Sequence, residues 1–269
     1  MSADGRRDDP KDEDAGAWIR AHCLGMAAKA EAAERHADDC TDRPCTLCQR
    51  FVCACGKPAD GSRRCTACET AAVLAAQLAP TRESVPPHFR WAFDGGGALL
   101  AERVRLSNSW VRAAIERPPT GHMVLVGSTG MGKTSLAVAM LDAWVRAAPS
   151  TRHGAMFLET GWLSRARARH KLGQDEAPLV EQAMTAPLLV LDDLGGGGER
   201  EDRDGCIADV VWTRTNHDRP LWVTTGLAAE GTTDDERLRS LVASLGRKYD
   251  GGFARRVVQG SRTIFLGAK

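Results

Sequence analysis

The sequence predicts an α/β fold, in which a parallel sheet carries helices on both faces, preceded by a small cysteine-rich α domain. Three observations support this prediction. Short apolar runs alternate with longer helical stretches from residue 99 onward, as in strand-helix-strand units. A glycine-rich octapeptide, GSTGMGKT, directly follows the first of these runs. Seven of the nine cysteines fall within residues 40–68.

The expected elements follow one another along the chain. Helices are expected on either side of the cysteine-rich stretch, and Pro80, Pro86 and Pro87 are expected to end the second of them. After these prolines helices and strands alternate. The helices are expected at 17–37, 69–79, 99–115, 135–148, 161–171 and 206–217, and the strands at 124–126, 155–158, 188–191 and 221–225.

This pattern divides the chain into four parts. Residues 1–16 are charged and lack an apolar segment, so we expect a disordered tail rather than a targeting signal. The cysteine-rich domain covers 17–80, a proline-rich linker covers 81–88, and the α/β domain covers 89–269. No apolar run is long enough to cross a bilayer, and we expect a cytoplasmic protein with no membrane partner.

The composition allows a real core and excludes a globally basic protein. The chain has 269 residues, of which 43% are hydrophobic, and its net charge is only +1. Any surface that binds nucleic acid must therefore be local. One candidate is the segment at 161–171, where Arg165, Arg167, Arg169 and Lys171 follow Trp162. A solvated helix face is the alternative interpretation of that charge run.

The octapeptide has the complete G-x-x-x-x-G-K-[ST] spacing of a phosphate-binding loop. Its glycines let backbone N–H groups turn inward around the phosphates, while Lys133 adds a positive charge and Thr134 a hydroxyl for Mg²⁺. The helix that follows points the positive end of its dipole at the same anion. The sequence therefore predicts a nucleotide and Mg²⁺ site formed by Gly127, Ser128, Thr129, Gly130, Met131, Gly132, Lys133, Thr134 and Ser135.

A second apolar run, LLVL at 188–191, ends in Asp192 and Asp193. Downstream of a phosphate-binding loop, carboxylates at a strand end are typical of a nucleotide-hydrolysing site. We expect Asp192 to hold the water shell of Mg²⁺. We expect Asp193 to orient or deprotonate the attacking water. The sequence therefore predicts that the protein hydrolyses the nucleotide as well as binding it.

The cysteine-rich stretch predicts zinc. Cys45-x-x-Cys48 and Cys65-x-x-Cys68 each have the spacing with which two thiolates hold one tetrahedral zinc ion. The first residues carry no secretory signal, so zinc is favoured over a disulfide framework. Four protein ligands leave no open position for water, which indicates a structural rather than a catalytic role.

Two ligand assignments are compatible with these spacings. In one, Cys53 and Cys55 join the 65/68 pair in a Cys₄ site, and a second zinc takes the remaining three cysteines with a histidine four residues upstream. In the other, a single zinc takes the 45/48 and 65/68 pairs. The candidate ligands are His36, Cys40, Cys45, Cys48, Cys53, Cys55, Cys65 and Cys68.

Five blocks together resemble the bacterial helicase loaders of the DnaC type and the transposition ATPases of the IstB type. They are VPPHFR at 85–90, GSTGMGKTSLAVAML from 127, LLVLDDLGG at 188–196, LWVTTGL at 221–227 and KYDGGFARRVVQG at 248–260. The resemblance covers residues 85–269 and implies a P-loop ATPase of the AAA+ class that lacks a full helical lid. It also implies ATP as the nucleotide, assembly into rings or spirals, and binding of single-stranded DNA.

The resemblance further assigns roles to single residues. Thr225 falls near the sensor that contacts the γ-phosphate or the attacking water, although the family's usual asparagine falls on Gly226. Arg256 falls at the arginine finger that one subunit supplies to the ATP of the next. Many relatives carry Asp-Glu where this chain has Asp192-Asp193, so we expect slow hydrolysis.

Three functions are compatible with these features. The first is an ATP-dependent loader that delivers a replicative ring helicase to single-stranded DNA during replication and grips the helicase through residues 17–80. The second is a transposition helper ATPase of the IstB type. The third is an interaction module in which bound ATP acts as a static switch. The cysteine-rich domain favours the first.

Overall fold

The structure is a computed structural model that describes residues 51–52, 58–59, 66–95, 100, 109–170, 176–196 and 205–267. The chain divides into two compact units, Met1–Ala75 and Ala76–Lys269. In the first unit β1 (Phe51–Val52) pairs antiparallel with β2 (Pro58–Ala59). The helix expected at 17–37 lies outside the described residues, as do all the predicted zinc ligands except Cys68. Among the helices described, none is long and apolar enough to cross a membrane.

The second unit is built on a parallel sheet of five strands in the order β4-β5-β6-β3-β7. This order places β6 between β3, which precedes the glycine-rich loop, and β5, which carries the two aspartates. All five carboxyl ends meet at one edge of the sheet, the edge at which ligands bind in such folds. The strands are β3 (Met123–Val126), β4 (Met156–Glu159), β5 (Leu189–Leu194), β6 (Leu221–Thr225) and β7 (Arg262–Phe265).

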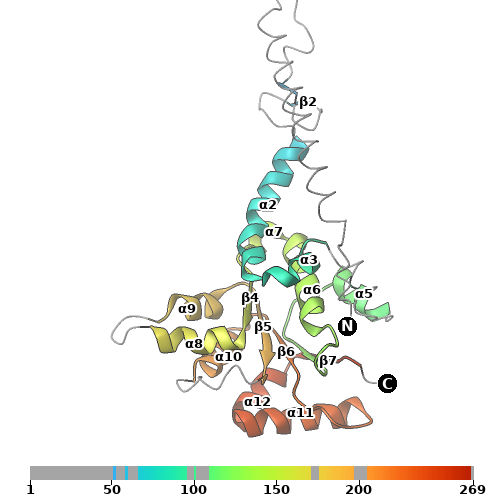
Figure 1. The fold of residues 1–269 in the computed structure, drawn as a ribbon, viewed down its shortest axis with the longest axis vertical. Helices are drawn as coiled ribbons and strands as arrows, with labels where there is room; N and C mark the ends of the chain where they lie inside the picture. The colour runs from blue at the N-terminus through green and yellow to red at the C-terminus, as the bar shows by residue number, and fades with distance from the viewer. Residues whose placement is uncertain are drawn as a thin grey trace, which may run out of the picture. The chain divides into compact units, whose positions relative to one another are not determined.

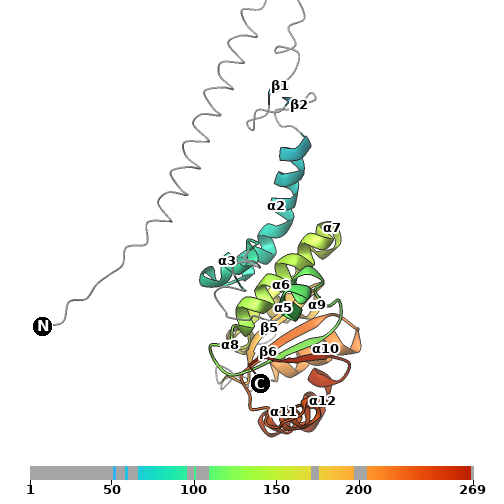
Figure 2. The same ribbon diagram turned by 90° about the vertical axis from the view of Figure 1, so that its right-hand side faces the viewer.

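Helices cover both faces of the sheet, as the sequence predicted (Figures 1 and 2). Alternate residues of the buried strands face opposite layers. One set, including Val124 and Val126 of β3, packs in a single core with residues of α8 to α12. The helix α6 contacts β3, β5 and β6 on the other side. The helices of these layers are α5 (Ser109–Glu116), α6 (Lys133–Ala147), α8 (Thr160–Arg169), α9 (Pro178–Thr185), α10 (Cys206–Asn216), α11 (Asp234–Lys248) and α12 (Gly251–Val258).

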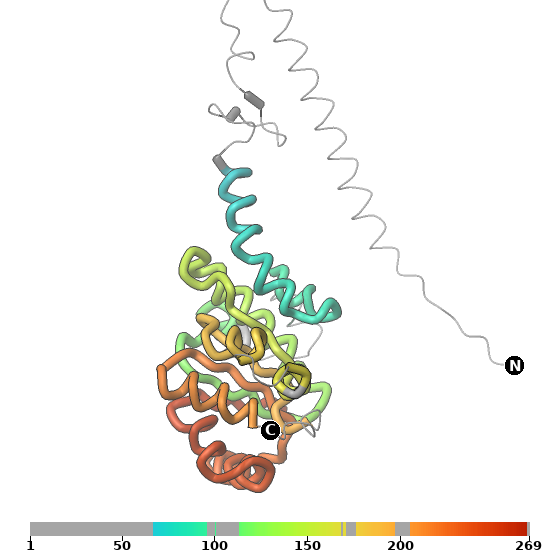
Figure 3. The backbone as a smooth tube through the Cα atoms, turned by 90° about the vertical axis from the view of Figure 1, so that its left-hand side faces the viewer, coloured from blue at the N-terminus to red at the C-terminus, as the bar shows by residue number. Residues whose placement is uncertain are grey.

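The C-terminal part of the chain folds into elements that the sequence analysis did not assign. Thr233 caps α11 through a capping box with Glu236, and Asp250 caps α12 by accepting from the backbone N–H of Phe253. The two helices lie side by side, in red in Figure 3, and β7 then completes the sheet. Short helical turns also occur at η1 (Pro87–Phe89), α3 (Arg90–Phe93) and α7 (Pro149–Arg152).

The predicted helix end at Pro80 is wrong, because α2 (Thr66–Ser84) continues through this proline. A proline inside a helix removes one hydrogen bond and costs roughly 3 kcal/mol. Tertiary contacts offset this cost at the end of the helix. Leu78 and Thr81 are buried, and the Ser84 hydroxyl accepts a hydrogen bond from the backbone N–H of Phe157 in β4 at 2.9 Å.

Asp142 of α6 makes the stability of this layer depend on pH. Arg146 donates from Nε to Asp142 Oδ1 at 2.7 Å, yet burial raises the pKa of Asp142 from 3.8 to about 6. Between these two values the folded protein binds more protons than the unfolded chain, so this carboxyl's contribution to the free energy of unfolding falls as pH rises.

We therefore expect Asp142→Asn to abolish the part of the pH dependence of the free energy of unfolding that comes from Asp142. Urea unfolding of wild type and variant from about pH 4 to about pH 7 would measure it. The free energy of unfolding of wild type minus that of the variant should decrease across this range and level off above it. A constant difference would contradict the assignment.

Candidate nucleotide-binding site

The glycine-rich loop connects β3 to α6 at the carboxyl edge of the sheet. Gly132 precedes the first turn of α6 with a φ of 79°, a left-handed conformation that glycine adopts without strain. A Cβ at Gly127 would lie 3.0 Å from the carbonyl oxygen of Leu266, so a larger residue would press on the chain just after β7. The glycines are therefore needed for the path of the loop.

Lys133 begins α6 and is buried against the loop. Its ammonium group donates to the carbonyl oxygens of Gly127 and Ser128, at 2.7 and 3.0 Å. Burial lowers the pKa of Lys133, while Asp192 and Asp193 oppose the shift. The Lys133 ammonium group is thus already held beside the glycine-rich loop, where the phosphates would bind.

A second group of contacts joins β5, β6 and α6 through Asp192. The hydroxyl of Thr134 donates to Asp192 Oδ1 at 3.0 Å, and that of Thr224 in β6 donates to the same oxygen at 2.5 Å. The backbone N–H of Asp193 donates to the Thr224 hydroxyl at 3.0 Å. Burial raises the pKa of Asp192, and the two threonine bonds oppose it.

Asp193 adopts a backbone conformation that is unfavourable for a non-glycine residue, with a φ of 59°. The hydroxyl of Thr160, at the start of α8, lies 3.2 Å from the carbonyl oxygen of Asp192 and 3.0 Å from that of Asp193. These contacts support the strained turn. Asp192 is buried, whereas the Asp193 side chain is exposed. This exposure suits the predicted contact of Asp193 with the attacking water.

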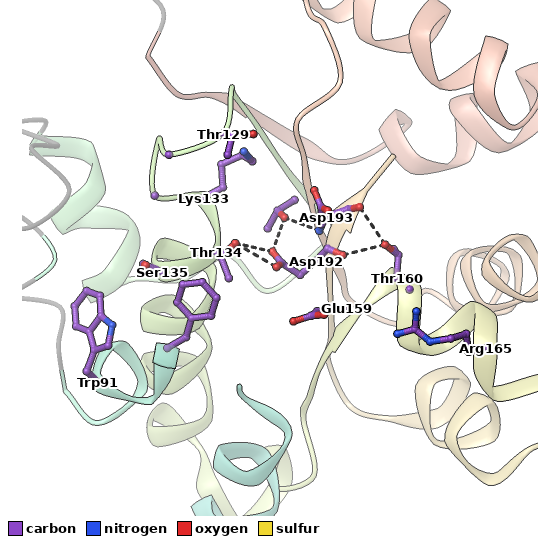
Figure 4. A pocket seen from close by; sticks show the side chains of 15 residues that line it. Trp91, Thr129, Lys133, Thr134, Ser135, Glu159, Thr160, Arg165, Asp192 and Asp193 are labelled. Atoms are coloured by element: carbon purple, nitrogen blue, oxygen red, sulfur yellow. Dashed lines mark hydrogen bonds between the residues drawn. The ribbon is translucent and has the colours of Figure 1, made fainter. Parts of the chain in front are cut away.

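These groups surround a cavity of about 880 Å³ (Figure 4). Its lining combines the glycine-rich loop, the ends of β4, β5 and β6, and the start of α8. The lining residues are Phe89, Trp91, Thr129, Gly130, Gly132, Lys133, Thr134, Ser135, Glu159, Thr160, Gly161, Arg165, Asp192, Asp193 and Thr224. The volume is suitable for a nucleotide.

The donor set fits Mg²⁺, a cation that prefers oxygen ligands and usually keeps several waters. The Thr134 hydroxyl and the Asp192 carboxylate, which were predicted to hold it, are adjacent and both line the cavity. Glu159 and Asp193 add two more carboxylates to the same wall. Among the described residues, no group of three or more histidine, cysteine or carboxylate side chains is placed to hold a metal ion, and zinc remains a prediction.

The structure brings together most, but not all, of the predicted site residues. Gly127 and Ser128 line a second cavity of about 320 Å³ instead of the main one. Thr225 does not line the main cavity; its hydroxyl donates to the carbonyl oxygen of Leu194 at 2.6 Å and accepts from the N–H of Leu227. Thr224, one residue earlier, points into the site.

Arg256 lies on α12 and is not among the residues that line the main cavity. It donates from Nη1 to Asn216 Oδ1 at 2.6 Å, and its guanidinium lies 5.1 Å from the centre of the Trp212 ring. Both partners belong to α10. In this position Arg256 does not reach the main cavity of its own chain, and its role as an arginine finger remains a prediction.

Sequence reasoning missed Glu159 and Thr160 as cavity residues. It singled out Arg165 for DNA contact, and at the end of β6 it assigned the sensor role to Thr225 instead of Thr224. The strand order explains this. Because β6 separates β3 from β5 and β4 flanks β5, residues at the ends of β4 and β6 necessarily border the two aspartates.

The cationic segment predicted to contact DNA is divided by the fold. Arg167 forms ion pairs with Glu176 and Asp209, which raise its pKa, so its charge is neutralised within the chain. Arg165 faces the cavity. Arg169 is exposed at the end of α8, and Lys171 lies outside the described residues. The segment is therefore not a continuous basic face.

Thr224→Val tests the hydrogen-bond arrangement around Asp192. It removes the hydroxyl at nearly constant shape and leaves the backbone N–H of Asp193 without this acceptor. We expect ATP hydrolysis to fall about tenfold or more, and ATP affinity to change little. Steady-state turnover and nucleotide titrations would measure the two effects. Thr225→Val is the matched control, since it removes an equally buried hydroxyl that bonds outside the cavity; a larger loss in Thr225→Val would favour the predicted sensor residue instead.

Similarity to known proteins is found among solved structures. No protein-family model and no curated protein matches the sequence. Among solved structures, the DnaC helicase loader is similar at 24% identity over 58% of this chain and 86% of that one, with a TM-score of 0.46. DnaI is similar at 18% identity over 63% and 85%, with a TM-score of 0.43. AMPPCP-bound DnaA from Aquifex aeolicus is similar at 18% identity over 61% and 47%, with a TM-score of 0.41.

Proposed function

We propose that this chain is an ATPase of the AAA+ class that loads a replicative ring helicase onto single-stranded DNA. The observation that carries the ATPase proposal is the convergence of Lys133, Thr134, Asp192 and Asp193 on one cavity. These residues come from the start of α6 and from the end of β5, and they supply the charge, metal ligands and water-facing carboxylate that phosphoryl transfer requires.

Each residue then has a distinct task. Lys133 and the backbone of the loop bind the phosphates. Thr134 and Asp192 would hold Mg²⁺, which neutralises charge on the β- and γ-phosphates. Asp193 is exposed at the edge of the cavity. It orients the attacking water or accepts its proton. Thr224 and Thr160 keep the two carboxylates in place by bonding the Asp192 side chain and the backbone of the turn.

The loader assignment is supported by the five sequence blocks that resemble the DnaC type, of which four fall on elements of the site or its edges. In this proposal residues 17–80 grip the helicase, and the ATPase assembles with other copies on single-stranded DNA. Arg256 completes the site of the neighbouring copy, in keeping with its position outside the lining of its own chain's cavity.

Co-purification tests the loader function directly. The full chain, expressed with the replicative helicase of its host, should retain that helicase through purification in the presence of ATP. A chain lacking residues 17–75, which keeps the part of α2 that belongs to the second unit, should lose the helicase but keep ATP binding. Retention of a transposase instead of the helicase would favour the transposition helper, and hydrolysis-independent retention of either would favour a static ATP switch.

Metal content tests the proposed zinc-binding domain. Thiolate-bound structural zinc should remain with the protein during purification. We expect about two zinc ions per chain for the two-site assignment and about one for the single-site assignment. Cys65→Ser combined with Cys68→Ser should lower this content in both cases. Zinc-free protein that folds normally in the presence of chelator would contradict both assignments.

A further inference from the structure

Arg165 is a cation of the main cavity that the proposed mechanism does not use. It lies on α8, and in Figure 4 its guanidinium points from that helix towards the wall formed by Glu159 and Thr160. This wall is opposite the glycine-rich loop, beyond the Thr134 and Asp192 pair. Lys133 and Arg165 are therefore on opposite sides of the metal ligands.

The position of Arg165 differs from that of the other arginines on α8. Arg167 is neutralised by Glu176 and Asp209. Arg169 is exposed at the helix end. Arg165, by contrast, is half-buried at the cavity, and its guanidinium lies 5.2 Å from the centre of the Trp162 ring. The indole, 53% exposed, supports the arginine at the rim without neutralising its charge.

Charge balance indicates what this cation meets. The wall around it carries the carboxylates of Glu159, Asp192 and Asp193. The loop side, where the inner phosphates would lie, is served by Lys133 and backbone N–H groups. A triphosphate that extends past Thr134 and Asp192 would bring its terminal phosphate towards the acidic wall. Arg165 lines the cavity on this side and, together with the Mg²⁺ that Thr134 and Asp192 would hold, would offset repulsion between the phosphate and the carboxylates.

We propose that Arg165 binds the terminal phosphate of the nucleotide and so makes the site discriminate between a nucleoside triphosphate and a diphosphate. This inference rests on the proposed ATP site. Trp162 holds the guanidinium at the rim, and the planar, multiply donating group can then bond two phosphate oxygens. The contact comes from the same chain as the loop, in contrast to Arg256.

Nucleotide affinities of the full-length chain with Mg²⁺ test this assignment. The probes are the triphosphate analogue AMPPCP and ADP, titrated against wild type, Arg165→Ala and Arg165→Lys. We expect Arg165→Ala to weaken AMPPCP about tenfold or more and ADP by less than about twofold, because only the former carries the terminal phosphate. Arg165→Lys should give an intermediate loss. Arg169→Ala is the matched control, since it removes the same charge from the same helix, and it should leave both affinities unchanged.

The outcomes separate this inference from the proposed function. Equal weakening of AMPPCP and ADP, or no change in either, would overturn the role of Arg165 while leaving the ATP site intact. Loss of single-stranded DNA binding with unchanged nucleotide discrimination would also overturn it, and would place Arg165 on a DNA surface. Failure of the wild-type chain to bind either nucleotide would overturn the proposed function, and this inference with it.

Discussion

Lys133→Ala should lose ATP affinity by about 100-fold, the largest effect on nucleotide binding expected from a single substitution. The ammonium group donates to two loop carbonyl oxygens and is buried at the start of α6, so no solvent-exposed group can replace it. With the alanine in place the loop keeps its glycines but loses the cation that offsets the phosphate charge. Titration of a fluorescent ATP analogue would measure the loss.

Asp193→Asn provides the comparison at the same site. It removes the exposed carboxylate but leaves the loop, Lys133 and the metal ligands unchanged. This variant should bind ATP with nearly wild-type affinity and hydrolyse it poorly. Thermal unfolding of both variants controls for misfolding. Equal ATP affinity in wild type and Lys133→Ala would remove the cavity from consideration as the nucleotide site.

Arg256→Ala should remove most hydrolysis, by roughly 1000-fold, with little change in ATP binding, because an arginine finger stabilises the charge of the transition state more than that of the ground state. Two contacts with α10 hold the Arg256 side chain in place. Asn216 accepts its hydrogen bond, and Trp212 lies against its guanidinium. Arg255→Ala is the matched control, since Arg255 is exposed on the same helix and bonds only the carbonyl oxygen of Gly251 among the interactions described.

Mixing variants shows whether Arg256 acts between copies. Arg256→Ala retains the phosphate-binding loop, and Lys133→Ala retains the arginine. Some interfaces in a mixture would therefore combine an intact loop from one copy with an intact arginine from the other. Recovery of ATPase activity on mixing is the expected result. Wild-type turnover by Arg256→Ala alone would exclude this residue from the mechanism.

The sequence alone was sufficient for the features that depend on local spacing. The glycine-rich loop is contiguous and follows a short apolar run, so β3 and α6 could be predicted from it, and roles for Lys133 and Thr134 could be proposed. The aspartates at the end of β5 were recognisable for the same reason. Alternating apolar runs also predicted β4, β5 and β6 within a few residues of their observed bounds.

Features that depend on long-range packing were decided only by the tertiary structure. Thr224 and Thr225 are equivalent in sequence terms, and the twist and order of the strands determine which one faces Asp192. Similarly, α2 continues past Pro80 because Ser84 is anchored to β4.

The three arginines of α8 show the same limit. The sequence groups them as one basic segment, but each has a different environment: Arg167 is paired within the chain, Arg165 lines the cavity and Arg169 is exposed. Of the groups that distinguish them, Asp209 and the aspartates of β5 are far from α8 in sequence. The free energy of a charged side chain is set by the groups around it in space, and only the folded chain specifies those groups.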